Sequence, residues 1–175
     1  MQFDVLYQEL ARGAEVIKVL VSGITSEEAR IKPSPDEWSV LEVIYHLCDE
    51  ERWDFRQHLD HILHRLDQPW PPKVPVGWET ARLNNERDLT KSVDEFLAER
   101  KRSLAWLKAL SSPDWETSVI APLGHQDDQI RVKAGDMLTS WVAHDNLHMR
   151  QLVELRRARV MRMVEPYDVE YAGSW

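Results

Sequence analysis

Apolar residues recur at helical spacing in four long segments of the chain, at residues 3–21, 39–66, 90–110 and 132–160. No segment shows the alternation of a long strand. The stripe of the first segment consists of Phe3, Leu6, Leu10, Ile17 and Leu20. Gly23 follows this stripe and is typical of a helix stop. The pattern predicts an all-α protein built from four main helices.

The start of the second segment carries the clearest helix signal in the chain. Ser39 and Glu42 have the spacing of a capping box, and Trp38 with Val43 has that of a hydrophobic staple. No glycine or proline interrupts residues 39–66, so the pattern predicts one continuous helix there. Residues 26–29 before it are expected to form a single short turn.

The connection after the second helix determines the predicted topology. Residues 67–77 contain four prolines and cannot continue a helix. The roughly 20 residues from 67 to 86 are long enough to run the length of a bundle. We therefore expect a single-domain four-helix bundle, residues 1–175, in up-down-down-up order, with a crossover that makes the second and third helices parallel. Trp70 and Trp78 are expected to pack this crossover onto the bundle.

The charge and cysteine content argue against several classes of protein. The chain has 22 Lys and Arg against 30 Asp and Glu, a net charge of -8, which disfavours nucleic acid as a partner. Its one cysteine, Cys48, cannot form an internal disulfide and is expected in the core. No segment reaches the roughly 18 apolar residues of a membrane span. These features predict a cytoplasmic protein with no membrane partner.

Two histidines in the fourth segment are candidate metal ligands. His144 and His148 are four residues apart, so on a helix both imidazoles project from one face, about 6 Å apart along the axis. They fall within the apolar stripe, where a polar group without a partner is costly. A metal ion would satisfy them, and so would hydrogen bonds within the core.

A third histidine of the second segment could complete such a site. His46 lies about two turns into that helix, at the edge of its apolar arc. Metal sites in helical bundles use side chains from facing helices, so His46 is the candidate third ligand. His58, His61 and His64 also follow helical spacing, but they lie about 18 Å or more further along the helix and are expected on the surface.

These residues together resemble the DinB-like (DinB/YfiT-like) superfamily. The resemblance rests on Trp38-Ser39, His46-Leu47, Glu51, a Pro-Leu-Gly turn at 122–124, His144-Asp145, and His148 followed by Gln151-Leu152. It implies a four-helix bundle with a crossover between its second and third helices, commonly a homodimer. It also implies a divalent metal ion held by His46, His144 and His148.

Three neutral imidazoles with an open coordination position suit Zn or Ni best, with Fe and Co as further candidates, and suit Mg or Ca poorly. Asp145, Glu50 and Glu51 are candidates for contacts that support the ligands. Asp145 could orient a ligating imidazole or lie at the edge of the bundle. Glu50 and Glu51 could contribute to the site or form a salt bridge with Arg52 or Arg150.

The resemblance implies a metal-dependent enzyme acting on a small molecule. Some superfamily members are S-transferases or isomerases that use a low-molecular-weight thiol, so a thiol S-transferase is the most concrete hypothesis. The nearest alternative is a hydrolase that uses metal-activated water. The rival from another class is a non-catalytic, dimeric helical bundle whose histidine site is structural or vestigial.

Overall fold

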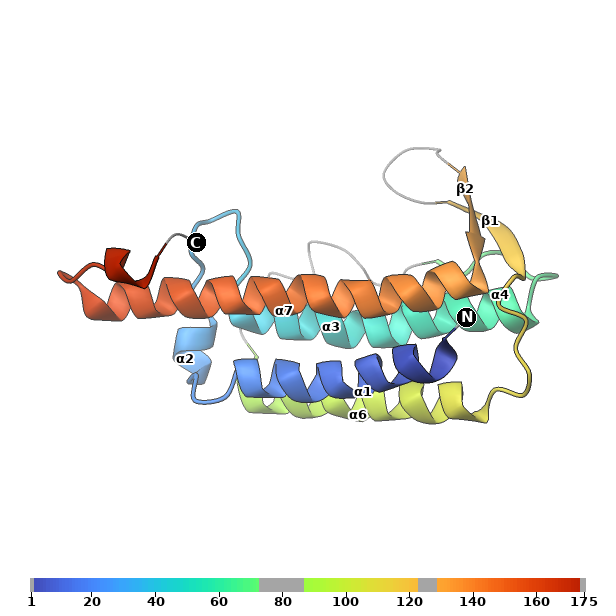
Figure 1. Cartoon of the computed structure of the whole chain (residues 1–175), viewed down its shortest axis with the longest axis horizontal. Helices are drawn as coiled ribbons and strands as arrows, with labels where there is room; N and C mark the ends of the chain where they lie inside the picture. Colours follow the sequence, from blue (N-terminus) through green and yellow to red (C-terminus); the bar gives the residue numbers. More distant parts are fainter. Residues whose placement is uncertain (1, 73–86, 123–128, 174–175) are drawn as a thin grey trace.

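The computed structural model describes residues 2–72, 87–122 and 129–173. Its helices are α1 (Phe3–Leu20), α2 (Ser26–Ala29), α3 (Val40–Trp53), α4 (Phe55–His64), α6 (Leu89–Ala109), α7 (Ala134–Val164) and a short 3-10 turn, η1 (Glu170–Ala172). Two strands, β1 (Ser118–Pro122) and β2 (Gln129–Lys133), form an antiparallel hairpin next to the start of α7 (Figure 1). The long helices confirm the predicted all-α bundle, to which the hairpin is a small addition.

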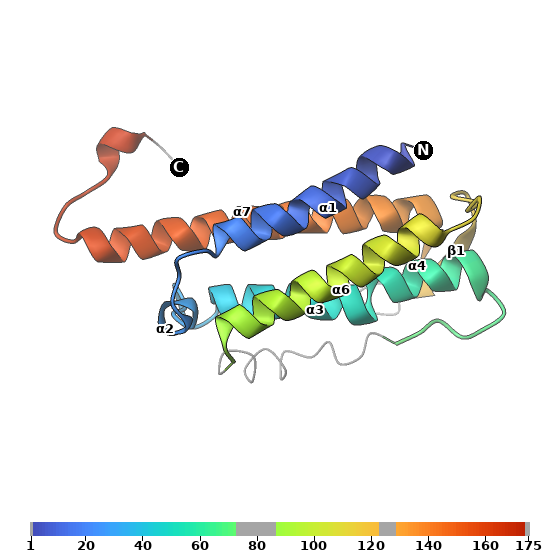
Figure 2. The same cartoon turned by 90° about the horizontal axis from the view of Figure 1, so that it is seen from below.

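The long helices follow the predicted up-down-down-up order. Helices α1 and α7 run in one direction along the bundle, whereas α3, α4 and α6 run in the other (Figures 1 and 2). The second and third long elements are therefore parallel, as the length of the crossover predicted. Helix α3 packs most extensively on α6, and α1 packs most extensively on α7. Residues 73–86 of the crossover, including Trp78, lie outside the described residues.

Helix α3 begins where its sequence indicates. The Glu42 N–H donates to Ser39 Oγ at 3.2 Å, and the Ser39 N–H donates to Glu42 Oε2 at 2.7 Å. This capping box satisfies two backbone donors that the first turn leaves without helical partners. Trp38 packs beside it against the apolar core. The start of α3, which carries the candidate ligand His46, is thus fixed by local interactions.

The predicted continuous helix over residues 39–66 is wrong, because it divides at Asp54 into α3 and α4. Asp54 has φ -118° and ψ -92°, outside the helical region. Its side chain is buried, and its Oδ1 lies 2.7 Å from Nδ1 of His58, one turn into α4. The break needs no glycine or proline because a buried side-chain pair holds the irregular backbone. The two residues are only four positions apart, but the pair holds the backbone because it is buried, and the apolar pattern does not show that burial.

The hairpin is the second feature that the apolar pattern did not show. Its strands pair Val119 with Val132 and Ala121 with Ile130. Only Ala121 and Val132 are buried, whereas Ile120 and Ile130 are exposed. Two five-residue strands with one buried residue each are too short to give a recognisable alternation. The Ala134 N–H donates to Thr117 O at 2.8 Å and joins the hairpin to the start of α7.

The apolar core forms two clusters along the bundle. One contains Ile17, Ile44 and Phe96, and the other contains Leu10, Leu138 and Trp141. Each of these six side chains is at most 1% exposed. Trp141 is therefore a core residue. The core draws on all four long elements, so it holds the helices that carry the candidate ligands.

Two of the three histidines expected on the surface are buried. His58 and His61 are 0% and 3% exposed, and only His64 is exposed. The ring of Trp70 covers the two, stacking on His58 at 4.4 Å between centroids and meeting His61 edge-on at 5.3 Å. The expected packing of Trp70 onto the bundle is confirmed. This packing explains why His58 and His61 are buried, because Trp70 of the crossover covers a face of α4 that the helical pattern alone predicts to be exposed.

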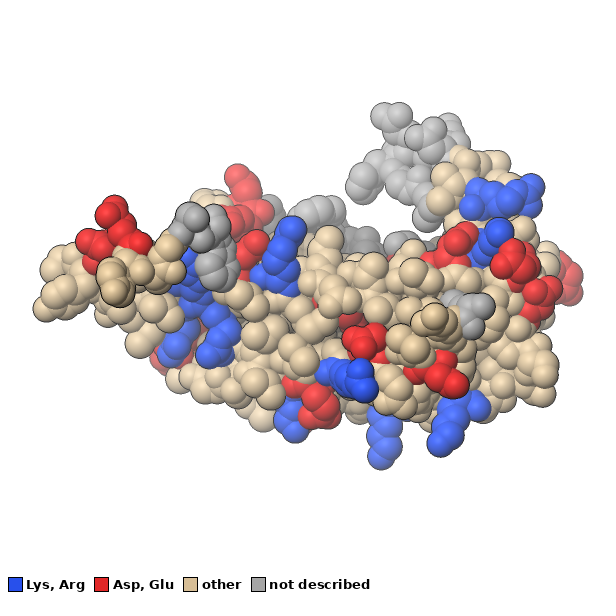
Figure 3. Space-filling model, in the orientation of Figure 1, with Lys and Arg blue, Asp and Glu red and all other residues tan. Residues whose placement is uncertain are grey.

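The surface mixes charges of both signs. On the face in Figure 3, Lys and Arg side chains are interspersed with Asp and Glu. No helix in the described part of the chain combines the length and apolar character needed to cross a lipid bilayer.

Candidate metal centre

The three histidines singled out in the sequence converge between α3 and α7. Nε2 of His144 lies 3.2 Å from Nε2 of His46 and 3.2 Å from Nε2 of His148. One ligand atom from each residue lies within 4.8 Å of the other two. His148 is buried, and His46 and His144 are half-buried. The fold thus places three imidazole nitrogens around one point close to the surface.

Hydrogen bonding alone does not account for this cluster. An imidazole Nε2 carries either one proton or one lone pair, so it can take part in one hydrogen bond at a time. Nε2 of His144 has two Nε2 neighbours at 3.2 Å, and a hydrogen bond explains one of them. In tetrahedral zinc sites with Zn–N bonds of about 2.0–2.1 Å, neighbouring nitrogens are about 3.3 Å apart. The donor set therefore fits a divalent metal ion.

His148 is held in the form that a metal ion requires. Its Nδ1 lies 2.8 Å from Oε1 of Gln151, an acceptor, so Nδ1 carries the proton and Nε2 presents its lone pair. Burial lowers the pKa of His148, while the bond to Gln151 and the charge of Asp145 act in the opposite direction. The net effect favours the neutral imidazole at neutral pH.

His46 has a carboxylate and an indole as neighbours. Nδ1 of His46 lies 3.7 Å from Oε1 of Glu50, one turn further along α3. The ring of Trp38 meets the His46 ring edge-on at 4.8 Å between centroids and lies parallel to the His148 ring at 6.1 Å. The Glu50 carboxylate thus lies near Nδ1 of His46 at an ion-pair distance, while Trp38 restricts rotation of both rings.

His144 packs against the aromatic residue that begins α4. The centroid of Phe55 lies 5.1 Å from that of His144, and its other neighbour is Trp141, on which it stacks at 5.6 Å. The break at Asp54 sets where α4 begins, so it also sets the position of Phe55. An irregularity in the backbone thereby shapes the wall of the candidate site.

A cavity of about 380 Å³ adjoins the cluster on the side of His148. This volume falls within the range of small-molecule sites in proteins. Its walls combine an aromatic ring, an aliphatic side chain and groups of both charges. The residues that line it are Asp36, Trp38, Leu147, His148, Arg150, Gln151 and Glu154.

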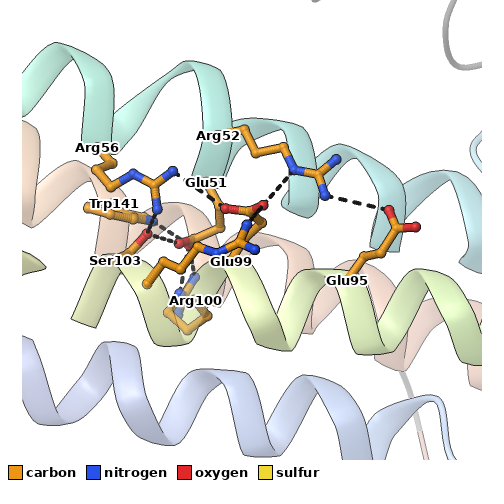
Figure 4. A network of polar contacts seen from close by, with 9 residues as sticks. Glu51, Arg52, Arg56, Glu95, Glu99, Arg100, Ser103 and Trp141 are labelled. Carbon is orange, nitrogen blue, oxygen red and sulfur yellow. Dashed lines mark hydrogen bonds and ion pairs between the residues drawn. The ribbon is translucent and has the colours of Figure 1, made fainter. Parts of the chain in front are cut away.

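Glu51 and Asp145, two of the acidic candidates, turn into the bundle interior. Both are buried, and both bind the guanidinium group of Arg100 on α6. Asp145 was expected to orient an imidazole or to lie at the edge of the bundle, and neither expectation includes an ion pair with Arg100. Glu51 forms a salt bridge as expected, but with Arg100 in place of Arg52 or Arg150. Burial raises the pKa of Glu51, although Arg100 and Ser103 act against the rise. Figure 4 shows Glu51 between Arg100, Ser103 and Trp141.

Nearer the surface, α3 and α4 form a second set of ion pairs with α6. Arg52 contacts Glu99 at 2.9 Å and Glu95 at 3.6 Å, and Arg56 contacts Glu99 at 3.4 Å (Figure 4). The guanidinium groups around Glu99 lower its pKa against the effect of burial. These contacts join α3 and α4 to α6 away from the histidine cluster.

Several residues around the histidines were not expected there from the sequence. Arg100 resembles other basic residues in the run 100–102, and nothing local marks it as buried. Phe55 owes its position to the break at Asp54. Gln151 carried a usable signal, because a residue three positions after His148 lies on the same helical face.

The fold and the site together define a four-helix bundle with a three-histidine cluster between α3 and α7. The sequence matches the DinB superfamily over residues 9–152. The chain therefore belongs to the DinB superfamily, as its motifs indicated.

Two solved structures share this fold. YfiT from Bacillus subtilis, described as a probable metal-dependent hydrolase with an unusual four-helix bundle topology, is 20% identical, with a TM-score of 0.74 over 89% of this chain and 86% of that one. A conserved protein from Enterococcus faecalis is 16% identical, with a TM-score of 0.65 over 90% of this chain and 96% of that one. No protein with a curated description matches the sequence.

Proposed function

We propose that the chain is a metal-dependent enzyme in which His46, His144 and His148 hold a divalent transition metal ion. The observation that carries the proposal is the position of His144 Nε2, 3.2 Å from both other Nε2 atoms. Two such contacts suit a shared cation and exceed what one hydrogen bond explains. An all-imidazole donor set favours Zn or Ni, with Fe or Co as alternatives, over Mg or Ca.

The neighbours of the cluster act on its imidazoles in two ways. Gln151 fixes the proton of His148 on Nδ1, and the Glu50 carboxylate, 3.7 Å from Nδ1 of His46, places a negative charge beside that ring. Trp38 and Phe55 limit the rotation of the imidazole rings. A divalent ion with three protein ligands and an open position supplies Lewis acidity and lowers the pKa of bound water towards neutrality. The chain supplies the geometry for that chemistry.

Hydrolysis of a small molecule is the reaction that we favour. The cavity beside His148 has room for a small substrate, and its charged and aromatic walls suit a polar organic molecule. The description of YfiT as a probable metal-dependent hydrolase supports the same class. Transfer to or from a low-molecular-weight thiol remains a prediction from the family resemblance, because it needs a thiol-binding pocket that no described contact identifies.

Metal content tests the first part of the proposal. Untagged protein purified without chelator is expected to carry about one equivalent of Zn, Ni, Fe or Co per chain, measured by elemental analysis. His46→Ala and His144→Ala should lose the metal, whereas His64→Ala, at an exposed histidine on α4, should retain it. Folded wild-type protein that neither carries metal nor binds added Zn or Ni would favour a non-catalytic bundle.

Activity of the metal-loaded protein tests the second part. One set of assays offers esters, amides and phosphoesters, and the other offers bacillithiol, mycothiol or glutathione with a general electrophile. Turnover in the first set that is lost in His144→Ala supports the hydrolase. Turnover confined to the second set replaces it with the thiol S-transferase. No turnover in either set, with metal bound, argues for a structural site.

The single domain, expected from the size and pattern of the chain, and the homodimer, implied by the resemblance, also stay predictions. Light scattering coupled to gel filtration measures the mass directly. A mass of about twice 20.5 kDa would support the homodimer, and a mass near 20.5 kDa would exclude it under those conditions.

A further inference from the structure

The two helices that carry the candidate ligands have limited direct contact with each other. Helix α3 packs mainly on α6 and helix α7 mainly on α1, while the contact between α3 and α7 is much smaller. The histidine cluster nevertheless requires α3 and α7 to be in register to within a fraction of an ångström. Something other than their own interface must therefore hold that register.

Arg100, from the third long helix, connects both ligand helices. Its Nε lies 2.6 Å from Oε1 of Glu51 on α3, and its Nη2 lies 2.6 Å from the same oxygen. On α7, Nη1 and Nη2 donate to the two oxygens of Asp145 at 2.6 and 2.8 Å. Nη1 also donates to the backbone oxygen of Leu10 on α1 at 2.7 Å. One guanidinium group, carried by α6, thus binds α1, α3 and α7.

These contacts use the full donor capacity of the guanidinium. Arginine has five N–H groups in a rigid planar fork, and the five contacts from Arg100 engage Nε once and each terminal nitrogen twice. The group is 1% exposed. Because so many bonds depend on one plane, small shifts of α3 or α7 would break several of them together.

The partner carboxylates lie close in sequence to the ligands. Asp145 follows His144 directly, and Glu51 comes five residues after His46, about 7.5 Å along α3. Glu51 is fixed further, since it accepts from Ser103 Oγ at 2.6 Å and from Trp141 Nε1 at 2.9 Å (Figure 4). Both carboxylates thus lie on the same helices as the candidate ligands, within about one and a half helical turns of them.

We infer that Arg100 is the positioning residue of the metal centre, because it holds α3 and α7 in the register that brings His46 to His144 and His148. This inference rests on the proposed metal site. Lysine would keep the charge but offers three donors from one nitrogen, and it cannot reproduce the planar fork. The role of Arg100 therefore depends on its shape as well as on its charge.

Gly13 on α1 makes room for this arrangement. A Cβ at position 13 would lie 2.9 Å from Oδ2 of Asp145, closer than real Cβ atoms approach. Alanine favours helix more than glycine does, so Gly13→Ala should fold. Its methyl group would displace the carboxylate that Arg100 binds, without removing any polar group.

The test compares Zn affinity with stability in the full-length protein. Zn affinity is measured by competition with a chromophoric chelator, and stability by urea unfolding of the metal-free protein, for wild type, Arg100→Lys, Gly13→Ala and Ile17→Ala. Ile17 is a fully buried core residue of α1 and is not among the residues that Arg100 hydrogen-bonds, so its truncation controls for general destabilisation. Arg100→Lys is expected to weaken Zn binding by about tenfold or more. Gly13→Ala should weaken it several-fold.

Each outcome decides the inference. Weaker Zn binding in Arg100→Lys and Gly13→Ala, with Ile17→Ala close to wild type, supports it. Equal Zn affinity in all four proteins, or equal losses that follow stability alone, overturns it and leaves the metal site intact. If Arg100→Lys does not fold, the comparison of Gly13→Ala with Ile17→Ala decides in the same way. Wild-type protein that neither carries metal nor binds added Zn or Ni overturns the proposed function instead, and the inference with it.

Discussion

Nδ1 of His148 lies 2.8 Å from Oε1 of Gln151, one turn further along α7. The amide oxygen accepts, so the imidazole must donate from Nδ1, and its Nε2 lone pair faces His144. Residues that orient a ligating histidine in this way affect metal affinity without touching the metal. The pair therefore gives a direct test of the candidate site.

We expect Gln151→Ala to weaken Zn binding by about 10- to 100-fold, because His148 loses the acceptor that fixes its tautomer. Gln151→Glu keeps an acceptor at that position and should bind Zn at least as tightly as wild type. Competition with a chromophoric chelator measures both affinities. Equal affinity in wild type and Gln151→Ala would show that this contact does not support a metal ligand.

The buried pair of His58 and Asp54 should matter for stability. His58→Leu leaves the Asp54 carboxylate buried without its 2.7 Å partner, and removing one member of a buried pair costs about 3–5 kcal/mol. We expect a loss of that order in urea unfolding. His64→Leu, on the same helix but exposed, should change the free energy of unfolding by less than about 0.5 kcal/mol. Similar losses in both variants would contradict the assigned burial.

Asp49 should make stability depend on pH. Burial raises its pKa from the ordinary 3.8 to about 6, although Arg52 and Arg87 act against the rise. Between these two values the folded state binds a proton that the unfolded state releases, so the contribution of Asp49 falls as the pH rises. Asp49→Asn should therefore raise the free energy of unfolding by about 1–3 kcal/mol at pH 7.5. The gain should shrink towards zero near pH 4; a gain independent of pH would be inconsistent with this account.

Cys48 should be unreactive in the folded protein. It is 0% exposed, and burial raises the pKa of its thiol to about 12 from the ordinary 9.0. At pH 8 this lowers the thiolate fraction about a thousandfold, and the thiolate is the reactive form. Ellman's reagent should therefore label the protein only after unfolding in urea. Rapid labelling of native protein would show that α3 opens near His46.

The features that were predictable from the sequence are those with local causes. The capping box of Ser39 and Glu42 acts within one turn, and its residues suffice to locate the start of α3. His144 and His148 share a face because of helical periodicity alone. The parallel course of α3 and α6 follows from the length of the chain between them. In each case the feature that determines the structure lies within a single stretch of the sequence.

The features that were missed depend on residues distant in the chain. His58 and His61 are buried because Trp70 returns across them, and the bundle pattern of α4 carries no sign of that cover. Arg100 is buried because Glu51 and Asp145, from two other helices, receive it. Periodicity treats a charged residue as exposed, and only the assembled bundle reveals its partners.

His46 and His144 are separated by 98 positions in the chain. An ion bound by both residues would cross-link the ends of a very long loop, and these ends rarely meet in the unfolded chain. At a free metal concentration of a thousand times Kd, binding of the ion would stabilise the folded state by about 4 kcal/mol. During synthesis the site cannot form until α7, which carries His144 and His148, has emerged from the ribosome. Acquisition of the metal would then mark the completion of the four-helix bundle, and its resistance to unfolding would follow the supply of metal in the cell.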